Sequence, residues 1–244
     1  MKMCMRGGHT EASPGASASI NELVEDRKVY KRVIELLREV GNEVHDVTPQ
    51  ESYAYPAELN YGISETNRIN PEVFFSIHFN SFNGAKGSEV CIYPGSSLTS
   101  RIGINILNNL QELGFVNRGL KPRSDLGELT NIKCESAIIE VCFVQEPDAS
   151  LYKSLGVEKI ARAIANGIDS RVKLKEEEIM KKIVTYLGDA DIYIALPLSQ
   201  KLGCPLMRET DFKTSGLKVD EVVKVGGVQK DRFETIKVNA NKYL

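Results

Sequence analysis

Apolar side chains dominate the run Val73-Phe74-Phe75-Ser76-Ile77-His78-Phe79-Asn80, which is interrupted late by a histidine and ends in an asparagine. A short apolar run rich in aromatic and β-branched residues is typical of a buried β-strand. Comparable runs occupy residues 2–6, 87–93 and 136–141, and a shorter one covers Glu43–Val47. The sequence therefore predicts a strand at each of these places.

Helical patterns alternate with these strands. Residues 19–40 carry an apolar stripe that stops at Gly41, and glycine is the usual residue just after a helix. Further helices are expected at about 58–69, 97–113 and 156–170. This alternation predicts an α/β domain whose mixed, mostly parallel sheet has helices on both faces. In open sheets of this kind, functional sites form at the C-terminal ends of the strands.

A chain of 244 residues can hold one medium domain and one small domain. We place the first domain at 1–172, a charged linker at 173–180 and the second domain at 181–244. The linker is predicted because residues 171–180 are highly charged and lack a hydrophobic period.

The second domain begins with a strand-like run at Lys182–Tyr186. A helix is expected at 191–202 and a strand at 221–225, which together predict a small β-α-β-β-α unit. A unit of this size is marginal as an independent fold, so we expect it to lean on a second copy or on the first domain.

Composition narrows the function classes. The formal net charge of −2 gives no support for nucleic-acid binding, which requires a basic surface. Five scattered cysteines without a close pair indicate reduced thiols in a cytosol. Residues 1–20 lack the apolar core of a signal peptide, and no apolar stretch is long enough to span a membrane. We expect a protein made in the cytoplasm without a signal peptide.

The three histidines of the chain carry the first chemical signal. His9 follows the predicted strand 2–6, and His78 lies at the end of the predicted strand 73–78. Two imidazoles at strand ends and one carboxylate would supply the three ligands of a catalytic zinc site, which keeps its fourth position open. His45 lies in an alternating strand and is expected at the surface.

The third ligand is open from the residues alone. Glu22 and Glu25 lie three residues apart and therefore occupy neighbouring positions on one helix face. Ser19-x-x-Glu22 also matches a capping box, in which the glutamate bonds back to the backbone. Glu22 is thus a candidate both for a metal ligand and for a helix cap.

Glu140 interrupts the apolar run 137–144. Burial would raise its pKa into the range useful for a general base, and the alternative is a structural ion pair. Cys142 would need an activating histidine to act as a nucleophile, and none is placed for it. We expect Cys142 to be a buried strand residue.

Four ordered motifs resemble one known family. Gly-His-Thr at 8–10, Ser-Ile-His-Phe-Asn at 76–80, Asn-Arg-Gly-Leu-Lys at 117–121 and Ala-Ile-Ile-Glu-Val-Cys-Phe at 137–143 are similar to those of zinc-dependent N-acetylmuramoyl-L-alanine amidases of the third type. The resemblance covers roughly residues 1–170. It implies a peptidoglycan substrate, a Zn²⁺ cofactor and hydrolysis of the amide between N-acetylmuramic acid and L-alanine.

The family uses two histidines and a glutamate as metal ligands, and a later glutamate in catalysis. Carried over residue by residue, the ligands fall on His9, Glu22 and His78, and the catalytic residue falls on Glu140. Glu22 is preferred to Glu25 because family members place this ligand about five helical turns before the glycine that ends the helix, here Gly41.

The segments 194–205, 220–227 and 231–235 resemble a single type-2 cell-wall-binding repeat of clostridial-type bacteria. This implies binding to a secondary cell-wall polymer. Such repeats usually occur three in tandem, so a homo-oligomer would restore multivalency. The codons for Glu176–Ile179 could also act as a ribosome-binding site before Met180, giving a separately translated C-terminal fragment that joins the full chain; a plain charged linker is the alternative.

The family resemblance further implies a phage endolysin that lyses the bacterial cell wall. The sequence shows no extra segment that could block the zinc site and keep the enzyme inactive. We therefore expect the enzyme to be kept away from its substrate: it is made in the host cytoplasm and reaches the wall after holin-mediated release. Two alternatives remain at this point. One is a zinc peptidase that cuts within the stem peptide, and the other is a wall-binding protein without activity.

Overall fold

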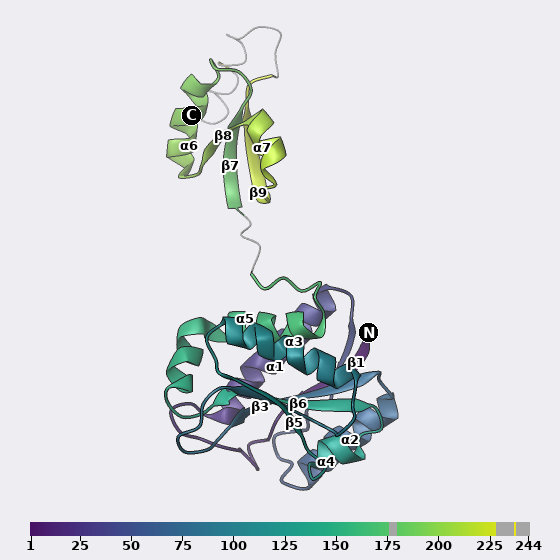
Figure 1. Cartoon of the computed structure of the whole chain (residues 1–244). Coiled ribbons are helices and arrows are strands. Elements are labelled where there is room, and N and C mark those ends of the chain that lie inside the picture. Colours follow the sequence, from purple (N-terminus) through teal and green to yellow (C-terminus); the bar gives the residue numbers. More distant parts are fainter. Residues whose placement is uncertain (176–179, 228–236, 238–244) are drawn as a thin grey trace. The chain divides into compact units, whose positions relative to one another are not determined.

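The computed structural model describes residues 1–175, 180–227 and 237, and the chain divides into two compact units, Met1–Lys175 and Glu176–Leu244. Both units are drawn in Figure 1. We treat each unit by itself and call them the first and the second unit.

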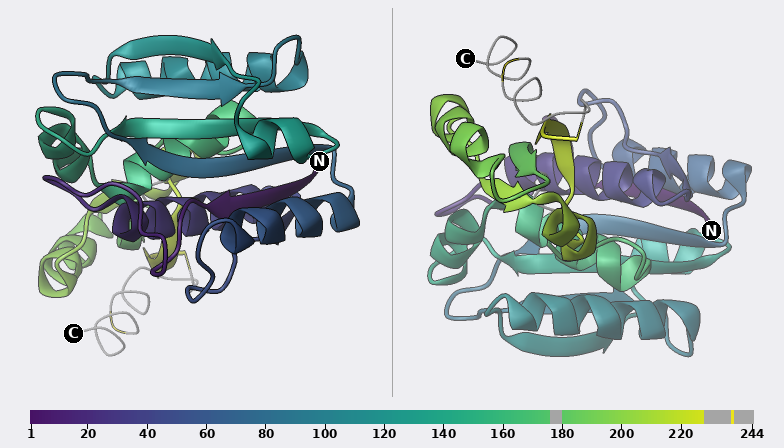
Figure 2. Two further views of the ribbon diagram at one scale, coloured as in Figure 1. Left: turned by 90° about the horizontal axis from the view of Figure 1, so that it is seen from below. Right: turned by 90° about the horizontal axis from the view of Figure 1, so that it is seen from above.

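The first unit is built on a six-stranded sheet with the order β2-β1-β3-β6-β4-β5. All neighbouring strands run parallel except β4 and β6, which are antiparallel, so the predicted mixed, mostly parallel sheet is confirmed. The strands can be followed in the left view of Figure 2. Their bounds are β1 Lys2–Gly7, β2 Glu43–Asp46, β3 Val73–Asn80, β4 Ser88–Ile92, β5 Asn117–Pro122 and β6 Glu135–Phe143.

Helices cover both faces of this sheet. Figure 1 shows α1, α3 and α5 on one face and α2 and α4 on the other. The central strand β3 is consequently buried on both faces, with Phe75 packed in the larger core and Phe74 in the smaller one. This two-sided burial explains why its sequence is an apolar run without alternation. The bounds are α1 Glu22–Glu39, α2 Ala57–Ile69, α3 Leu98–Glu112, α4 Gly127–Asn131 and α5 Asp148–Ile168.

Three elements of the first unit differ from the predictions. The motif 117–121, where no strand was predicted, lies in the half-exposed strand β5. This strand is at the edge of the sheet, so its sequence lacks a buried apolar run. Helix α4 was missed because five residues are too few to show a helical period. Helix α5 begins at Asp148, well before the expected residue 156. Its first part was not predicted because Gly156, with a left-handed φ of 77°, interrupts the helix.

The second unit contains a three-stranded parallel sheet with the order β8-β7-β9. Its described part has the order β-α-β-α-β. The predicted order β-α-β-β-α is therefore wrong after the second strand, where a helix follows instead of a third strand. Parallel strands cannot be joined by a hairpin, and helix α7 makes the connection between the two outer strands, β8 and β9. The bounds are β7 Met180–Tyr186, α6 Ile192–Leu202, β8 Leu206–Arg208, α7 Glu209–Ser215 and β9 Val219–Val225.

Two further predictions touch residues that the structure does not describe. The helix expected after the strand at 221–225 lies outside the described residues, as do residues 176–179 of the expected linker. Met180, which we placed at the end of that linker, is already the first residue of β7. Within the described ranges, no helix combines the length and apolar character needed to cross a membrane.

Candidate active site and metal centre

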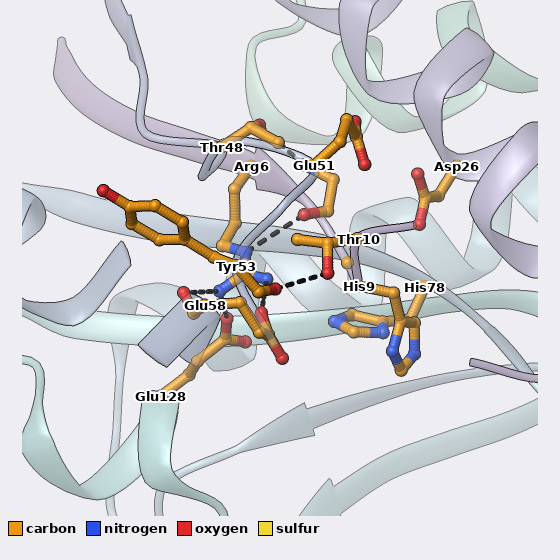
Figure 3. A network of polar contacts seen from close by, with 12 residues as sticks. Arg6, His9, Thr10, Asp26, Thr48, Glu51, Tyr53, Glu58, His78 and Glu128 are labelled. Carbon is orange, nitrogen blue, oxygen red and sulfur yellow. Dashed lines mark hydrogen bonds and ion pairs between the residues drawn. The ribbon is translucent and has the colours of Figure 1, made fainter. Parts of the chain in front are cut away.

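The structure brings together the three residues expected to bind a metal. His9 follows the end of β1, Glu22 is the first residue of α1, and His78 lies in β3 beside β1. Their potential ligand atoms all lie within 4.8 Å of one another. The two imidazole rings meet edge to face with centroids 5.1 Å apart, and Figure 3 shows them side by side.

Glu22 occupies the centre of this cluster. Its Oε1 lies 3.1 Å from Nε2 of His9 and 3.2 Å from Nδ1 of His78. The same oxygen accepts the backbone N–H of Phe79 at 3.1 Å, and Oε2 accepts that of Ala16 at 2.8 Å. The carboxylate is therefore fixed by groups on three separate segments of the chain.

The capping interpretation of Glu22 is wrong. Asn21 is the N-cap of α1, and its Oδ1 accepts the backbone N–H of Val24 at 3.0 Å. Glu25, the other candidate ligand, instead accepts the hydroxyl of Tyr152 at 2.9 Å and pairs with Lys28. Of the two glutamates, only Glu22 faces the histidines.

Close packing between the strand ends requires a glycine before His9. A Cβ atom at Gly8 would lie 2.3 Å from Cε1 of His78, far inside van der Waals contact. The absence of a side chain at Gly8 thus lets the two histidines approach each other.

The charges of the cluster suit a cation. Burial raises the pKa of Glu22, but hydrogen bonds from His78 and His9 outweigh it and hold that pKa well below its ordinary value. Burial lowers the pKa of His78, but Glu22 and Glu140 raise it to about 9. His78 thus holds a proton that a metal ion would displace, so metal binding should strengthen as the pH rises. Two imidazoles and one ionised carboxylate are donors that zinc accepts.

Glu140 lies on the strand next to His78. It is the Cα partner of His78 across β3 and β6, and of Glu89 across β4 and β6. Its Oε2 is shielded from solvent and has no hydrogen-bond partner among the described residues, which speaks against a structural ion pair. Burial raises the pKa of Glu140 to about 7, although His78 lowers it.

The remaining sequence candidates fall where they were expected. Cys142 is fully buried, and burial raises its pKa far above the ordinary value, which makes it a poor nucleophile. His45 lies at the surface, with Nε2 2.8 Å from a carboxylate oxygen of Glu43.

The three candidate ligands and Glu140 line a cleft of about 460 Å³. Besides the four predicted residues, its lining includes a buried cluster of charged residues that was not predicted from the sequence. Arg6 is 1% exposed and forms ion pairs with Glu58 and Glu128, as Figure 3 shows. The only sequence signal was an arginine at the end of the apolar run 2–6, and its two partners lie far away in the chain.

Asn80 and Arg118, to which the sequence assigned no role, meet on Glu89. Asn80 donates from Nδ2 to Glu89 Oε1 at 2.9 Å, and Arg118 donates from Nε to Oε2 at 2.7 Å. Arg118 also lies over the ring of Phe143, 5.2 Å from its centroid. This arrangement neutralises Glu89 beside Glu140.

Comparison with known proteins now identifies the family. Residues 4–170 match the model of the N-acetylmuramoyl-L-alanine amidase family. The chain belongs to this family. Its first unit therefore carries the fold of this family, in agreement with the resemblance found in the motifs.

Individual relatives agree with this assignment. An uncharacterized protein of Clostridium perfringens is 35% identical over 177 residues, which cover 70% of this chain and 52% of that protein. The endolysin of Bacillus phage SPP1 is 27% identical and covers 70% of this chain and 65% of its own length. Among solved structures, the catalytic domain of the CD27L endolysin, which targets Clostridia Difficile, is 28% identical with a TM-score of 0.64, covering 69% of this chain and 96% of that domain.

The match is confined to part of the relatives. The chain spans about half the length of the Clostridium perfringens proteins that it matches.

Replacing Glu140 with glutamine tests its catalytic role. Because its Oε2 has no hydrogen-bond partner in the described part of the chain, an amide of the same shape should fit without breaking a contact, while the proton acceptor is lost. We expect wall-lysis activity to fall by about 10²–10⁴-fold with a melting temperature that does not fall, because a neutral side chain replaces a buried charge. Glu112→Gln, at an exposed position of α3, is the matched control and should keep full activity. An active Glu140→Gln protein would contradict the assignment.

The pH profile tests the same group in the unaltered protein. Only the ionised carboxylate accepts a proton, so kcat/KM must fall as the pH drops through the pKa of Glu140. Burial raises this pKa from 4.5 to about 7, and a cation at the neighbouring site would draw it back down. We expect the midpoint of the acidic limb between these two values. A profile that stays flat down to pH 4 would show that another group acts as the base.

Proposed function

We propose that the protein is a zinc-dependent N-acetylmuramoyl-L-alanine amidase that cleaves peptidoglycan between N-acetylmuramic acid and L-alanine. The observation that carries the proposal is the convergence of His9, Glu22 and His78 with Glu140 on the adjacent strand, in a chain of this family. His9, Glu22 and His78 would hold the zinc ion, and Glu140 would be the general base.

The chain's own residues define the proton path. A bound zinc ion would lower the pKa of a water molecule and polarise the scissile carbonyl. Glu140, with its free Oε2, takes the proton of the attacking water and then delivers it to the leaving amine of L-alanine. Burial raises the pKa of Glu140 above that of an ordinary glutamate, which favours both uptake of the proton and its later release.

The biological setting is a further part of the proposal. Similarity to a phage endolysin and to an endolysin catalytic domain supports a role in lysis of the host cell wall. In this account, the enzyme is made in the host cytoplasm and reaches the wall after a holin opens the membrane.

The second unit is proposed to bind a secondary cell-wall polymer. The support is its sequence similarity to a cell-wall-binding repeat and its separate compact sheet and core, formed by residues such as Val184, Leu198 and Val223. Binding of several copies to a repetitive polymer would raise the effective concentration of the enzyme at its substrate. We propose that a homo-oligomer, or a complex with the separately translated fragment, provides these copies.

The reaction products distinguish the amidase from a zinc peptidase. Digestion of purified clostridial-type walls should create new N-terminal alanine, detected by labelling the released amines and by mass spectrometry. A chelator should abolish the reaction, and added zinc should restore it. New amines on any other residue would favour a peptidase that cuts within the stem peptide, and activity unaffected by chelation would exclude the metal.

The internal start at Met180 makes a separate prediction. Because Met180 is the first residue of β7, a chain that starts there keeps the three strands described for the second unit. If this start is used, expression of the natural coding sequence should give a second, folded polypeptide of residues 180–244. Its mass should be about 7 kDa, in proportion to its share of the 27.1 kDa chain. Met180→Leu should remove this companion without changing the full-length chain. A band that persists in the variant would show that it arises by proteolysis.

A further inference from the structure

His9 has an unfavourable backbone conformation that contacts with other residues must stabilise. Its φ angle is 58°, in the left-handed region that non-glycine residues adopt only rarely. It lies two residues beyond Gly7, the last residue of β1, so the hydrogen bonds of the strand do not hold it. Its side chain must nevertheless present Nε2 to Glu22 at 3.1 Å.

Arg27, on α1, makes the contacts that hold this segment. Its Nη1 donates to the carbonyl oxygen of Gly8 at 2.7 Å, and its Nη2 donates to that of His9 at 2.8 Å. Both carbonyl groups of the Gly8–His9 pair are thus bound to one planar guanidinium group. The approach is so close that a Cβ atom at Gly7 would lie 2.5 Å from Nη1.

The guanidinium group is itself held on its other sides. Its Nε donates to Oε1 of Glu51 at 2.9 Å, and Nη2 also reaches Oε2 of Glu51 at 3.4 Å. Its Nη1 also donates to Oδ1 of the buried Asp26 at 2.8 Å. All five N–H groups of an arginine therefore have acceptors, and a lysine, with three donors on one atom, cannot reproduce this pattern.

Glu51 also holds the residues after His9 by hydrogen bonds. Its Oε2 accepts the backbone N–H of Glu11 at 3.0 Å, and its carbonyl oxygen accepts that of Ala12 at 3.1 Å. The chain on both sides of His9 is consequently fixed by one Arg27–Glu51 pair.

We propose that Arg27 is a positioning residue that holds His9 ready to bind the metal ion, and that Glu51 orients Arg27 for this task. The proposal rests on the proposed function, because it takes His9 to be a zinc ligand. The hydrogen bonds of Arg27 go to Glu51, Asp26 and the carbonyl oxygens of Gly8 and His9, so it would act on the site through the backbone that carries His9. Such outer contacts to a metal ligand typically govern affinity for the metal.

Zinc affinity, measured by competition with a chromophoric chelator on the full-length protein, tests the proposal without using activity. Arg27→Lys keeps the charge and loses the two-carbonyl grip, so we expect its zinc affinity to fall by about 10–100-fold. Arg32→Lys is the matched control. Arg32 is also on α1 and pairs with three glutamates, but it binds no backbone group near the site, and this variant should bind zinc like the parent.

A double-mutant cycle separates positioning of His9 from a general loss of structure. In a His9→Ala protein, Arg27→Lys should cause no further loss of zinc affinity, because the ligand that it positions is gone. An equal loss in both backgrounds would show a general structural effect and overturn the proposal. Unchanged affinity in Arg27→Lys alone would also overturn it.

Glu51→Ala gives an independent answer if Arg27→Lys does not fold. Its side chain is 43% exposed, so the protein should tolerate its removal, and we expect a several-fold loss of zinc affinity from the freed guanidinium group. Parent-like affinity in Glu51→Ala would overturn the proposal. A parent protein that binds no zinc would overturn the proposed function as well, whereas a failure of the variants alone overturns only the role of Arg27.

Discussion

The rest of the site depends on the contact of the buried Glu22 carboxylate with the imidazoles of His9 and His78. Glu22 is only 4% exposed, and an ionised carboxylate at such a position is costly unless it is paired and hydrogen-bonded. His9, His78 and the backbone N–H of Phe79 provide those partners on one oxygen. The parallel register of β1 and β3 and the start of α1 must all be correct for these groups to meet.

This arrangement is favourable for binding a cation and unfavourable without one. Glu140 lies beside Glu89 and His78 in the sheet, and its Oε2 lacks a partner in the described part of the chain. The unpartnered carboxylate oxygen of Glu140 and the left-handed φ of His9 both destabilise the folded first unit. Packing elsewhere in the unit must offset this cost. A bound metal ion would recover part of this cost, which couples metal binding to the stability of the first unit.

The sequence predicted those features whose signals are local. The strand β3 showed an apolar run because both of its faces are buried, and His78 and Glu140 stood out as polar residues in such runs. The choice between Glu22 as ligand and as cap was not local, since it depended on Asn21 taking the cap and on histidines that lie elsewhere in the sequence. Arg6 and Arg27 were missed for the same reason: their partners come together only in the folded sheet.

Anomalous X-ray diffraction at the zinc absorption edge, on crystals of active protein purified without added chelator, tests the central claim most directly. The account predicts one strong peak at about 2.0–2.2 Å from Nε2 of His9, Oε1 of Glu22 and Nδ1 of His78, with room for one further ligand on the side of Glu140. Active protein whose crystals show no peak there, or a peak bound by other residues, would contradict it.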